Sequence, residues 1–222
     1  MKSLAPLFVV VTLAVAAAGQ VTTLKNEIPA SRYYNVEKKA AELLKQTNYR
    51  SIWTKEYFLD RAKPARLQER KLYEVIRPNK WRSLDESYYD KPKREEIIAV
   101  GKSFYWKYEA EEWRKGDLSD GSDFAIDAGP SASQFRYLPA VDLDGIVTEY
   151  YEEKALRADA AFATYASDIL THVRIGRSWY SADGKLLKKV VERTIEGYEE
   201  LLRETTTYEY DPKDLEIEAP IK

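Results

Sequence analysis

Cysteine is absent from the 222-residue sequence, and histidine occurs only once. Without cysteine the chain can form no disulfide, no thiolate nucleophile and no sulfur-ligated metal site. It also lacks the acylated cysteine that would tether an exported lipoprotein to a membrane. The single histidine, His172, is not accompanied by a nucleophile-elbow sequence, so a Ser-His-Asp catalytic site is not predicted.

An excess of charge of one sign is lacking as well. The chain has 35 Lys and Arg residues against 37 Asp and Glu residues, which gives a net charge of −2. Such a balance produces no global positive field that would attract nucleic acid. We therefore expect no nucleic-acid partner.

Long apolar runs are confined to the start of the chain. Met1 and Lys2 are followed by an apolar run over residues 4–18, which ends in small residues. This pattern is typical of a secretory signal peptide, whereas a membrane-spanning helix usually needs about 20 apolar residues. We expect residues 1–19 to be a cleaved signal peptide, with a retained anchor as the alternative. Residues 20–222 then form a single domain that is soluble in the periplasm and not lipid-anchored.

In the stretch from residue 167 to residue 222, side chains alternate between two sides with a period of two, which is typical of half-buried strands. Ile169, Thr171, Val173, Ile175 and Trp179 fall on one side, and Leu170, His172, Arg174, Ser178 and Tyr180 fall on the other. Residues 181–184 follow as a hairpin turn, in which Gly184 can adopt a positive φ. The runs 185–194, 198–210 and 215–221 continue the pattern, so an antiparallel meander is predicted.

Strand periodicity also covers most of residues 49–108 and 134–152. Gly101 and Lys102 mark a tight hairpin between the runs 95–100 and 103–108. Residues 116–133 are predicted to be a loop, and residues 154–166 a short helix or a mobile loop. One helix is predicted, with Asn35 as its N-cap and with Val36, Ala40, Leu43 and Leu44 on one apolar stripe.

Several short motifs follow one another in a familiar order. They are residues 77–82 (RPNKWR), the hairpin 97–106 (IIAVGKSFYW), residues 141–145 (VDLDG) before 150–152 (YYE), Trp179 before 183–188 (DGKLLK), and residues 208–211 with 217–220. In this order the chain resembles the LolA-like family of exported carriers. That family includes the periplasmic lipoprotein carrier and related lipid-binding lipoproteins.

The resemblance implies a mainly β (α+β) fold. It consists of a curved antiparallel half-barrel sheet of about nine to eleven strands, with an N-terminal helix packed on its concave face. An apolar cavity between sheet and helix then holds acyl chains. The candidate lining residues are Leu43, Leu44, Trp53, Tyr57, Trp81, Phe104, Trp106 and Trp179. The sequence departs from the well-known carriers in offering only one clear helix.

The function implied is that of a non-enzymatic carrier. It binds acyl chains of a lipid or lipoprotein and moves them across the periplasm in outer membrane biogenesis. Its expected partners are this lipid or lipidated protein cargo and membrane-bound donor and acceptor proteins, and the carrier itself is a monomer. A periplasmic sensor or scaffold that uses the same cavity is the alternative. A carboxylate-dependent hydrolase is a further, less favoured one.

No cofactor or metal is expected. Asp117, Asp120, Asp123 and Asp127 surround Gly121, but their spacing does not match an EF-hand calcium loop. A second charged cluster consists of Lys91, Lys93 and Arg94 beside Pro92. We interpret it as a solvated turn, with docking on a membrane as the alternative.

Overall fold

The computed structural model describes residues 26–117, 133–159, 170–195 and 200–221. The expected signal peptide and most of the acidic loop after Asp117 lie outside the described residues. The elements are α1 (Ala30–Gln46), β1 (Tyr49–Phe58), β2 (Arg66–Ile76), β3 (Lys80–Ser87), β4 (Lys93–Val100), β5 (Ser103–Tyr108), β6 (Arg114–Asp117), β7 (Ser133–Leu143), β8 (Ile146–Asp159), β9 (Leu170–Tyr180), β10 (Leu186–Ile195) and β11 (Leu201–Tyr210).

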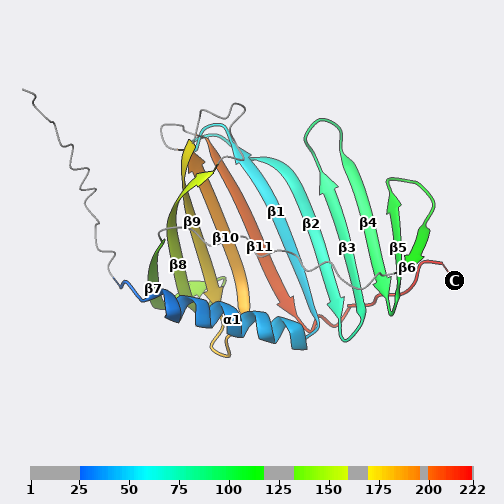
Figure 1. Ribbon diagram of the computed structural model, residues 1–222, viewed down its shortest axis with the longest axis horizontal. Coiled ribbons are helices and arrows are strands. Elements are labelled where there is room, and N and C mark those ends of the chain that lie inside the picture. The colour runs from blue at the N-terminus through cyan, green and yellow to red at the C-terminus, as the bar shows by residue number, and fades with distance from the viewer. Residues whose placement is uncertain (1–25, 118–132, 160–169, 196–199, 222) are drawn as a thin grey trace, which may run out of the picture.

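All eleven strands form one antiparallel sheet in the order β6-β5-β4-β3-β2-β1-β11-β10-β9-β8-β7. The two halves of the sequence meet in the middle, where Tyr49 of β1 lies opposite Tyr210 of β11 and opposite Val75 of β2. The sheet stays open, because β6 and β7 are its two edges (Figure 1). The predicted curved half-barrel with one N-terminal helix is therefore confirmed.

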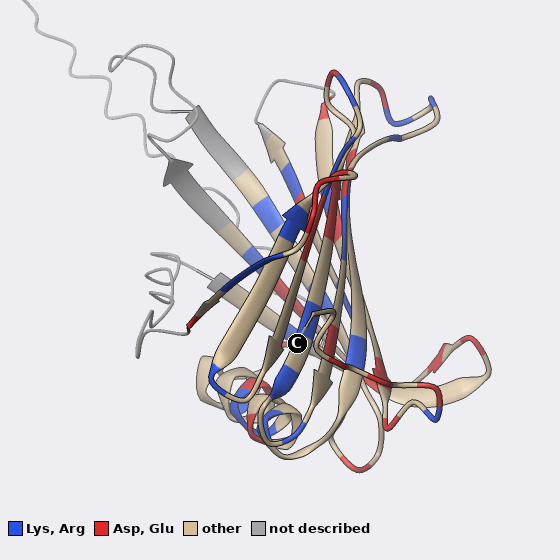
Figure 2. Cartoon of the chain, turned by 90° about the vertical axis from the view of Figure 1, so that its right-hand side faces the viewer, with Lys and Arg blue, Asp and Glu red and all other residues tan. Residues whose placement is uncertain are grey.

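Helix α1 lies across the concave face of the sheet, over the ends of β7 to β11 (Figures 1 and 2). Tyr33 and Ala40 of the helix are each 2% exposed. They share a core cluster with Phe135, Tyr151 and Tyr180 of the sheet. We call this the helix-side face, and the other the opposite face.

The helix begins at Ala30, preceded by Pro29, so the predicted start at Asn35 is wrong. The physical reason is Tyr33. Its ring centroid lies 4.7 Å from that of Phe135 in β7, and burying the ring brings an additional turn into the helix. Within the predicted apolar stripe, Ala40 is buried, while Leu43 and Leu44 are half-buried.

Two predictions of loop or helix are also wrong, because the structure has strands there. Residues 154–159 continue β8, because this strand pairs with β9 as far as Asp159 opposite Leu170. Residues 114–117 form the short edge strand β6, which pairs with β5 and whose last two residues belong to the stretch 116–133 that was predicted to be a loop. Both strands pair with a neighbour in the chain order, but local composition does not reveal this pairing.

The tail after β11 is not the final strand that its alternation predicted. Residues 212–221 instead leave the sheet and reach its opposite face. Asp214 binds Arg50 of β1 there, and Ile217 is 3% exposed. Pro212 and Pro220 have no N–H to donate to a strand ladder, which disfavours pairing over this segment.

The predicted turns are confirmed in their essential geometry. Gly184 has a φ of +88°, and Gly101 a φ of +64°. Between β7 and β8, both Asp144 and Gly145 have positive φ, which matches the right-handed twist of a two-residue hairpin. These turns fix the register of the strands on either side.

Candidate ligand-binding face

The structure divides the predicted lining residues between the two faces of the sheet. Trp53, Tyr57, Trp81, Phe104 and Trp106 lie on the helix-side face, as the strand registers show. All five side chains are half-buried. Leu43 and Leu44 lie in the last turns of α1, close to the start of β1.

Trp179 lies on the opposite face. Its register partner is Lys188, and its ring packs edge-on against Tyr150 at 5.1 Å between centroids. Tyr57 shares the helix-side face but lies near the far end of β1, beside Glu200. These two residues are therefore separated from the other predicted aromatic residues.

Aromatic rings gather on the helix-side face of β1, β2, β3 and β5. We call this group the aromatic band; its members are Tyr49, Trp53, Tyr73, Trp81, Phe104 and Trp106. The centroids of Tyr49 and Tyr73 are 6.1 Å apart, and those of Tyr73 and Trp81 are 5.9 Å apart. Phe104 and Trp106 are stacked at 4.7 Å. Such distances are in the range in which aromatic rings attract one another beyond simple burial.

The register explains why these rings come together. Tyr49, Val75, Trp81, Ala99 and Phe104 lie directly opposite one another across five successive strands. Directly opposed side chains of an antiparallel ladder share a face and lie close together. The aromatic band is therefore a product of pairing between strands: β1 and β5 contribute two rings each, β2 and β3 one each, and β4 none.

Sequence reasoning missed Tyr49 and Tyr73. Tyr49 shares its face with Trp53 by simple alternation along β1, so period two could have found it. Tyr73 is opposite Ser51 and is connected to the band only through the β1–β2 register. Burial, with a smaller effect from Tyr73, raises the pKa of Tyr49 to about 12, although Arg77 opposes the shift. This end of the band is thus largely shielded from water.

Gly116 of the edge strand β6 supports the stacked pair at the end of the band. A Cβ atom at this position would lie 2.8 Å from the Phe104 ring and 3.2 Å from the Trp106 ring. The two rings therefore cover the glycine backbone directly. Only a residue without a side chain leaves room for this packing.

Farther along the same strands, the helix-side face becomes charged. Lys55 pairs with Glu69 at 3.1 Å, and Lys71 pairs with Asp85 at 2.8 Å. A groove of about 440 Å³ opens here. It is lined by Glu69, Lys71, Asp85, Glu86, Ser87, Lys93, Arg94, Glu95, Tyr108 and Glu109. The face thus offers apolar rings near the helix end and polar groups at the far end.

A smaller pocket of about 250 Å³ lies between α1 and the strands β9 and β10. Ala40, Ala41 and Leu44 line it from the helix. Lys189 of β10 pairs with Glu37 of the helix at 2.7 Å beside this pocket. The predicted lining residue Leu44 therefore lies at a pocket between helix and sheet.

Two further properties concern metals and membranes. Among the residues described, no three His, Cys, Asp or Glu side chains are arranged to hold a metal ion. None of the described segments contains a helix long and apolar enough to cross a membrane.

Comparison with known proteins gives similarities only at the level of structure. No protein-family model and no curated protein matches the sequence. LprF from Mycobacterium bovis is similar with a TM-score of 0.45 and 9% identity, over 87% of this chain and 99% of that chain. A domain described as an outer membrane lipoprotein-sorting protein, from Vibrio parahaemolyticus, has a TM-score of 0.27 and 12% identity, over 82% and 93%.

A DUF1329 family protein from Desulfovibrio piger ATCC 29098 is similar with a TM-score of 0.28 and 12% identity, over 86% of this chain and 96% of that chain. The chain is thus similar in fold to solved structures that include a lipoprotein-sorting domain, as its sequence motifs predicted. With TM-scores below 0.5, these similarities carry no argument about a ligand or an activity.

Proposed function

We propose that the helix-side face binds an acyl chain of a lipid or of a lipidated protein. In this proposal the protein carries that cargo across the periplasm and catalyses no reaction. The observation that supports it is the aromatic band: half-buried rings gather on the face that carries the helix. Rows of charged residues on the same strands would then meet the polar part of the cargo.

The energetics of such binding are sufficient without any catalytic group. Burying an acyl chain gains about 0.8 kcal/mol per CH₂, so a chain of about sixteen carbons gains on the order of 12 kcal/mol gross. Association and ordering oppose this by several kcal/mol. The remainder is enough to extract an acyl chain from a membrane surface, while a few polar groups supply specificity.

The proposal assigns roles to parts of the chain that the structure does not describe. Residues 1–19 act as a signal peptide that is cleaved on export, and residues 20–222 act as one domain. Among the predicted lining residues, Trp53, Trp81, Phe104 and Trp106 contact the cargo. Trp179 is not included, because it lies on the opposite face.

Two matched variants test the assignment. Trp106→Glu places a charge in the aromatic band, whereas Trp179→Glu places the same charge on the opposite face at a position that is also half-buried. We expect Trp106→Glu to lower the uptake of a fluorescent fatty acid at least tenfold, and Trp179→Glu to leave it within about twofold. Cooperative urea unfolding of both variants controls for loss of fold.

Equal uptake by the two variants would reject the helix-side face as the binding surface. Native mass spectrometry of the protein purified from its exported compartment would complement this assay. Additional mass that extracts as lipid supports the proposed carrier function. Transfer of this lipid between vesicles by the protein distinguishes a carrier from a sensor. A ligand-free mass together with no fatty-acid uptake would refute the proposal.

A further inference from the structure

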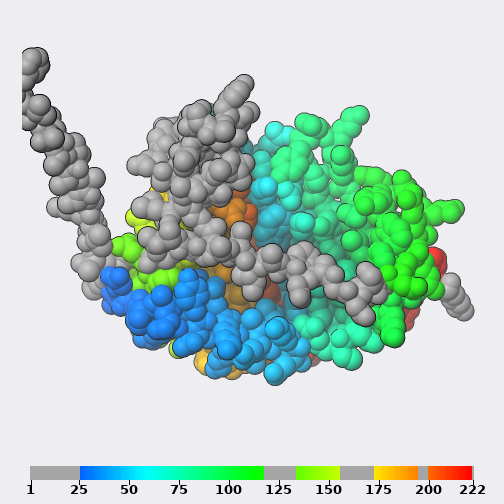
Figure 3. Space-filling model, in the orientation of Figure 1, coloured from blue at the N-terminus to red at the C-terminus, as the bar shows by residue number. Residues whose placement is uncertain are grey.

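Two neighbouring hairpin tips at the upper edge of the sheet are rich in basic residues, and we call them the twin tips. They comprise residues 59–67, which connect β1 to β2 and include the first two residues of β2, and residues 88–94, which connect β3 to β4 and include the first two residues of β4. Figure 3 shows the two tips at this edge, the first in cyan and the second in green. They contain six basic and two acidic residues, a net charge of +4 in a chain whose total is −2.

Hydrogen bonds hold the two tips together. The Arg66 guanidinium donates to the backbone oxygen of Tyr89 at 2.6 Å. The Tyr88 amide donates to the backbone oxygen of Gln68 at 2.8 Å, and Lys55 donates to the Tyr89 hydroxyl at 2.9 Å. The bases of the two tips are therefore held side by side.

Apolar side chains accompany the positive charge. Leu59 is 60% exposed, Tyr89 is 43% exposed and Leu67 is 36% exposed. Arg61 and Lys91, one from each tip, are exposed as well. Exposed apolar and aromatic residues among Lys and Arg are typical of proteins that bind at a membrane interface, where the rings and chains enter the headgroup layer.

The neighbouring hairpin tip limits this surface on one side. Glu109, Glu111 and Glu112 lie between β5 and β6, and Glu109 accepts a hydrogen bond from the Arg94 amide. The charge therefore changes sign along the edge of the sheet. A partner that fits the twin tips must be negatively charged and must accept inserted apolar side chains.

We infer that the twin tips dock the protein on an anionic lipid surface. The partner is a leaflet that contains acidic phospholipid, recognised by charge and by the insertion of Leu59 and Tyr89. Such docking places the charged groove at the end of β2 to β5 beside the membrane, because Lys93 and Arg94 belong to both the groove and a tip. The docking surface itself is separate from the aromatic band.

Vesicle flotation of the full chain tests the inference. The probes are vesicles of phosphatidylcholine alone, and of phosphatidylcholine mixed equally with phosphatidylglycerol. Each Lys or Arg near an anionic leaflet contributes about fivefold to partitioning. We expect the protein to bind the mixed vesicles and to bind the neutral vesicles little. Binding to the mixed vesicles should decrease with added salt, because the Debye length shortens from about 10 Å at 0.1 M to about 3 Å at 1 M.

The matched variants carry the same change in net charge at different places. Arg61→Glu/Lys91→Glu reverses one charge in each tip and should weaken binding to mixed vesicles about 30-fold or more. Lys38→Glu/Lys45→Glu reverses two exposed charges of α1. Its binding to the mixed vesicles should stay within about twofold of that of the unmodified chain. Far-UV circular dichroism checks that both variants fold.

Three results would overturn the inference: no binding to either kind of vesicle, equal binding to both kinds, or equal weakening by the two double variants. Uptake of a fluorescent fatty acid from solution should be unchanged in the tip variant, because the aromatic band is intact. Loss of vesicle binding with normal uptake therefore isolates the docking surface from the proposed ligand-binding face.

Discussion

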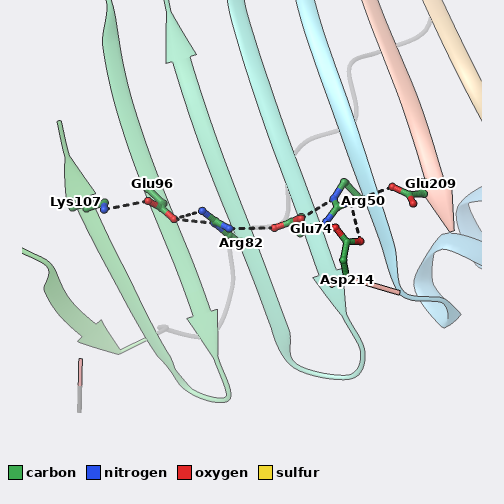
Figure 4. Close-up of polar contacts among 7 residues, drawn as sticks. All are labelled: Arg50, Glu74, Arg82, Glu96, Lys107, Glu209 and Asp214. Atoms are coloured by element: carbon green, nitrogen blue, oxygen red, sulfur yellow. Dashed lines mark hydrogen bonds and ion pairs between the residues drawn. The ribbon is translucent and has the colours of Figure 1, made fainter. Parts of the chain in front are cut away.

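The Arg50 guanidinium of β1 binds the Glu74 carboxylate of β2, with 2.8 Å between Nε and Oε1. The Glu74 side chain is only 5% exposed, and Arg82 of β3 approaches its other oxygen at 3.6 Å. This pair is the centre of a ladder of charges on the opposite face (Figure 4). The ladder runs Lys107, Glu96, Arg82, Glu74, Arg50 and Glu209, with Asp214 of the tail also bound to Arg50.

A second ladder crosses the other half of the same face. It runs Arg136, Glu152, Arg177, Glu192 and Arg203, one residue from each strand from β7 to β11. In both ladders the sign of the charge alternates from strand to strand. A slip of one residue in any pairing would turn these side chains to the other face. The ladders therefore disfavour incorrect registers of the sheet.

Glu74→Gln should lower the free energy of unfolding by about 1–3 kcal/mol. The amide keeps the shape of the side chain but removes the charge that two arginines share in a buried position. Urea denaturation measures this as a lower midpoint at an unchanged m-value. Glu209→Gln is the control, because that side chain is 58% exposed and should change stability by less than about 0.5 kcal/mol.

Glu192 connects stability to pH in the second ladder. Burial by itself would raise the pKa of Glu192, but hydrogen bonds from Arg177 and Arg203 together outweigh it, and the pKa lies below its usual value. A lowered pKa in the folded state means that the carboxylate stabilises the fold above the ordinary Glu range. That contribution is lost as the pH falls through the folded-state pKa.

Glu192→Gln should accordingly flatten the acid side of the stability profile. We expect the difference in unfolding free energy between the original chain and the variant to be largest near pH 7 and to shrink below about pH 4. Urea midpoints across this range measure the difference. Glu42→Gln, on the exposed side of α1, is the control, and its plot of unfolding free energy against pH should run parallel to that of the original chain. A parallel plot for Glu192→Gln would contradict the stabilising role assigned to the Glu192 carboxylate.

Strand β9 illustrates what the sequence could and could not predict. Alternation correctly placed Val173, Ile175 and Trp179 on one face, and Arg174, Ser178 and Tyr180 on the other. Alternation could not show which of the two sets lies on the helix-side face and which lies on the opposite face. The polar set lies on the helix-side face, where Arg174 binds Glu153 of β8 and Ser178 is fully buried. For Arg174 this burial depends on the pairing of β9 with β8, which brings Glu153 next to it.

The candidate ligand-binding face could likewise be predicted only in part. Trp53, Trp81, Phe104 and Trp106 could be chosen from the sequence as aromatic residues in strands, and they share one face. Trp179 was chosen on the same grounds, but it lies on the opposite face. A period of two gives the relative facing of residues within a strand, whereas the facing between strands depends on register.

Gly116→Ala should disturb the end of the aromatic band. The new methyl group would lie 2.8 Å from the Phe104 ring, so the ring must move or the edge strand must detach. We expect a loss of about 1–3 kcal/mol in stability and a changed near-UV circular dichroism spectrum from the Phe104–Trp106 stack. Gly176→Ala is the control, since its methyl group would meet no atom closer than 3.5 Å, and both observables should remain near their original values.

Ile217 should contribute more than Asp214 to holding the tail against the sheet. Ile217 is 3% exposed, and replacing such a residue by Ala costs about 2–5 kcal/mol where the surrounding structure stays in place. The Asp214 side chain is 73% exposed, and an ion pair that is so exposed to water contributes little to stability. The apolar contact therefore dominates, and the ion pair mainly orients the chain at the point where it leaves β11.

Limited proteolysis and hydrogen exchange over residues 211–221 measure this ranking. Ile217→Ala should increase cleavage and exchange of the tail strongly, Asp214→Asn only slightly, and Ile221→Ala, at a position 38% exposed, hardly at all. If Asp214→Asn released the tail as completely as Ile217→Ala, the charge on Arg50 and not the burial of Ile217 would hold this segment. The tail would then detach at high salt, because an exposed ion pair is screened whereas a buried apolar side chain is not.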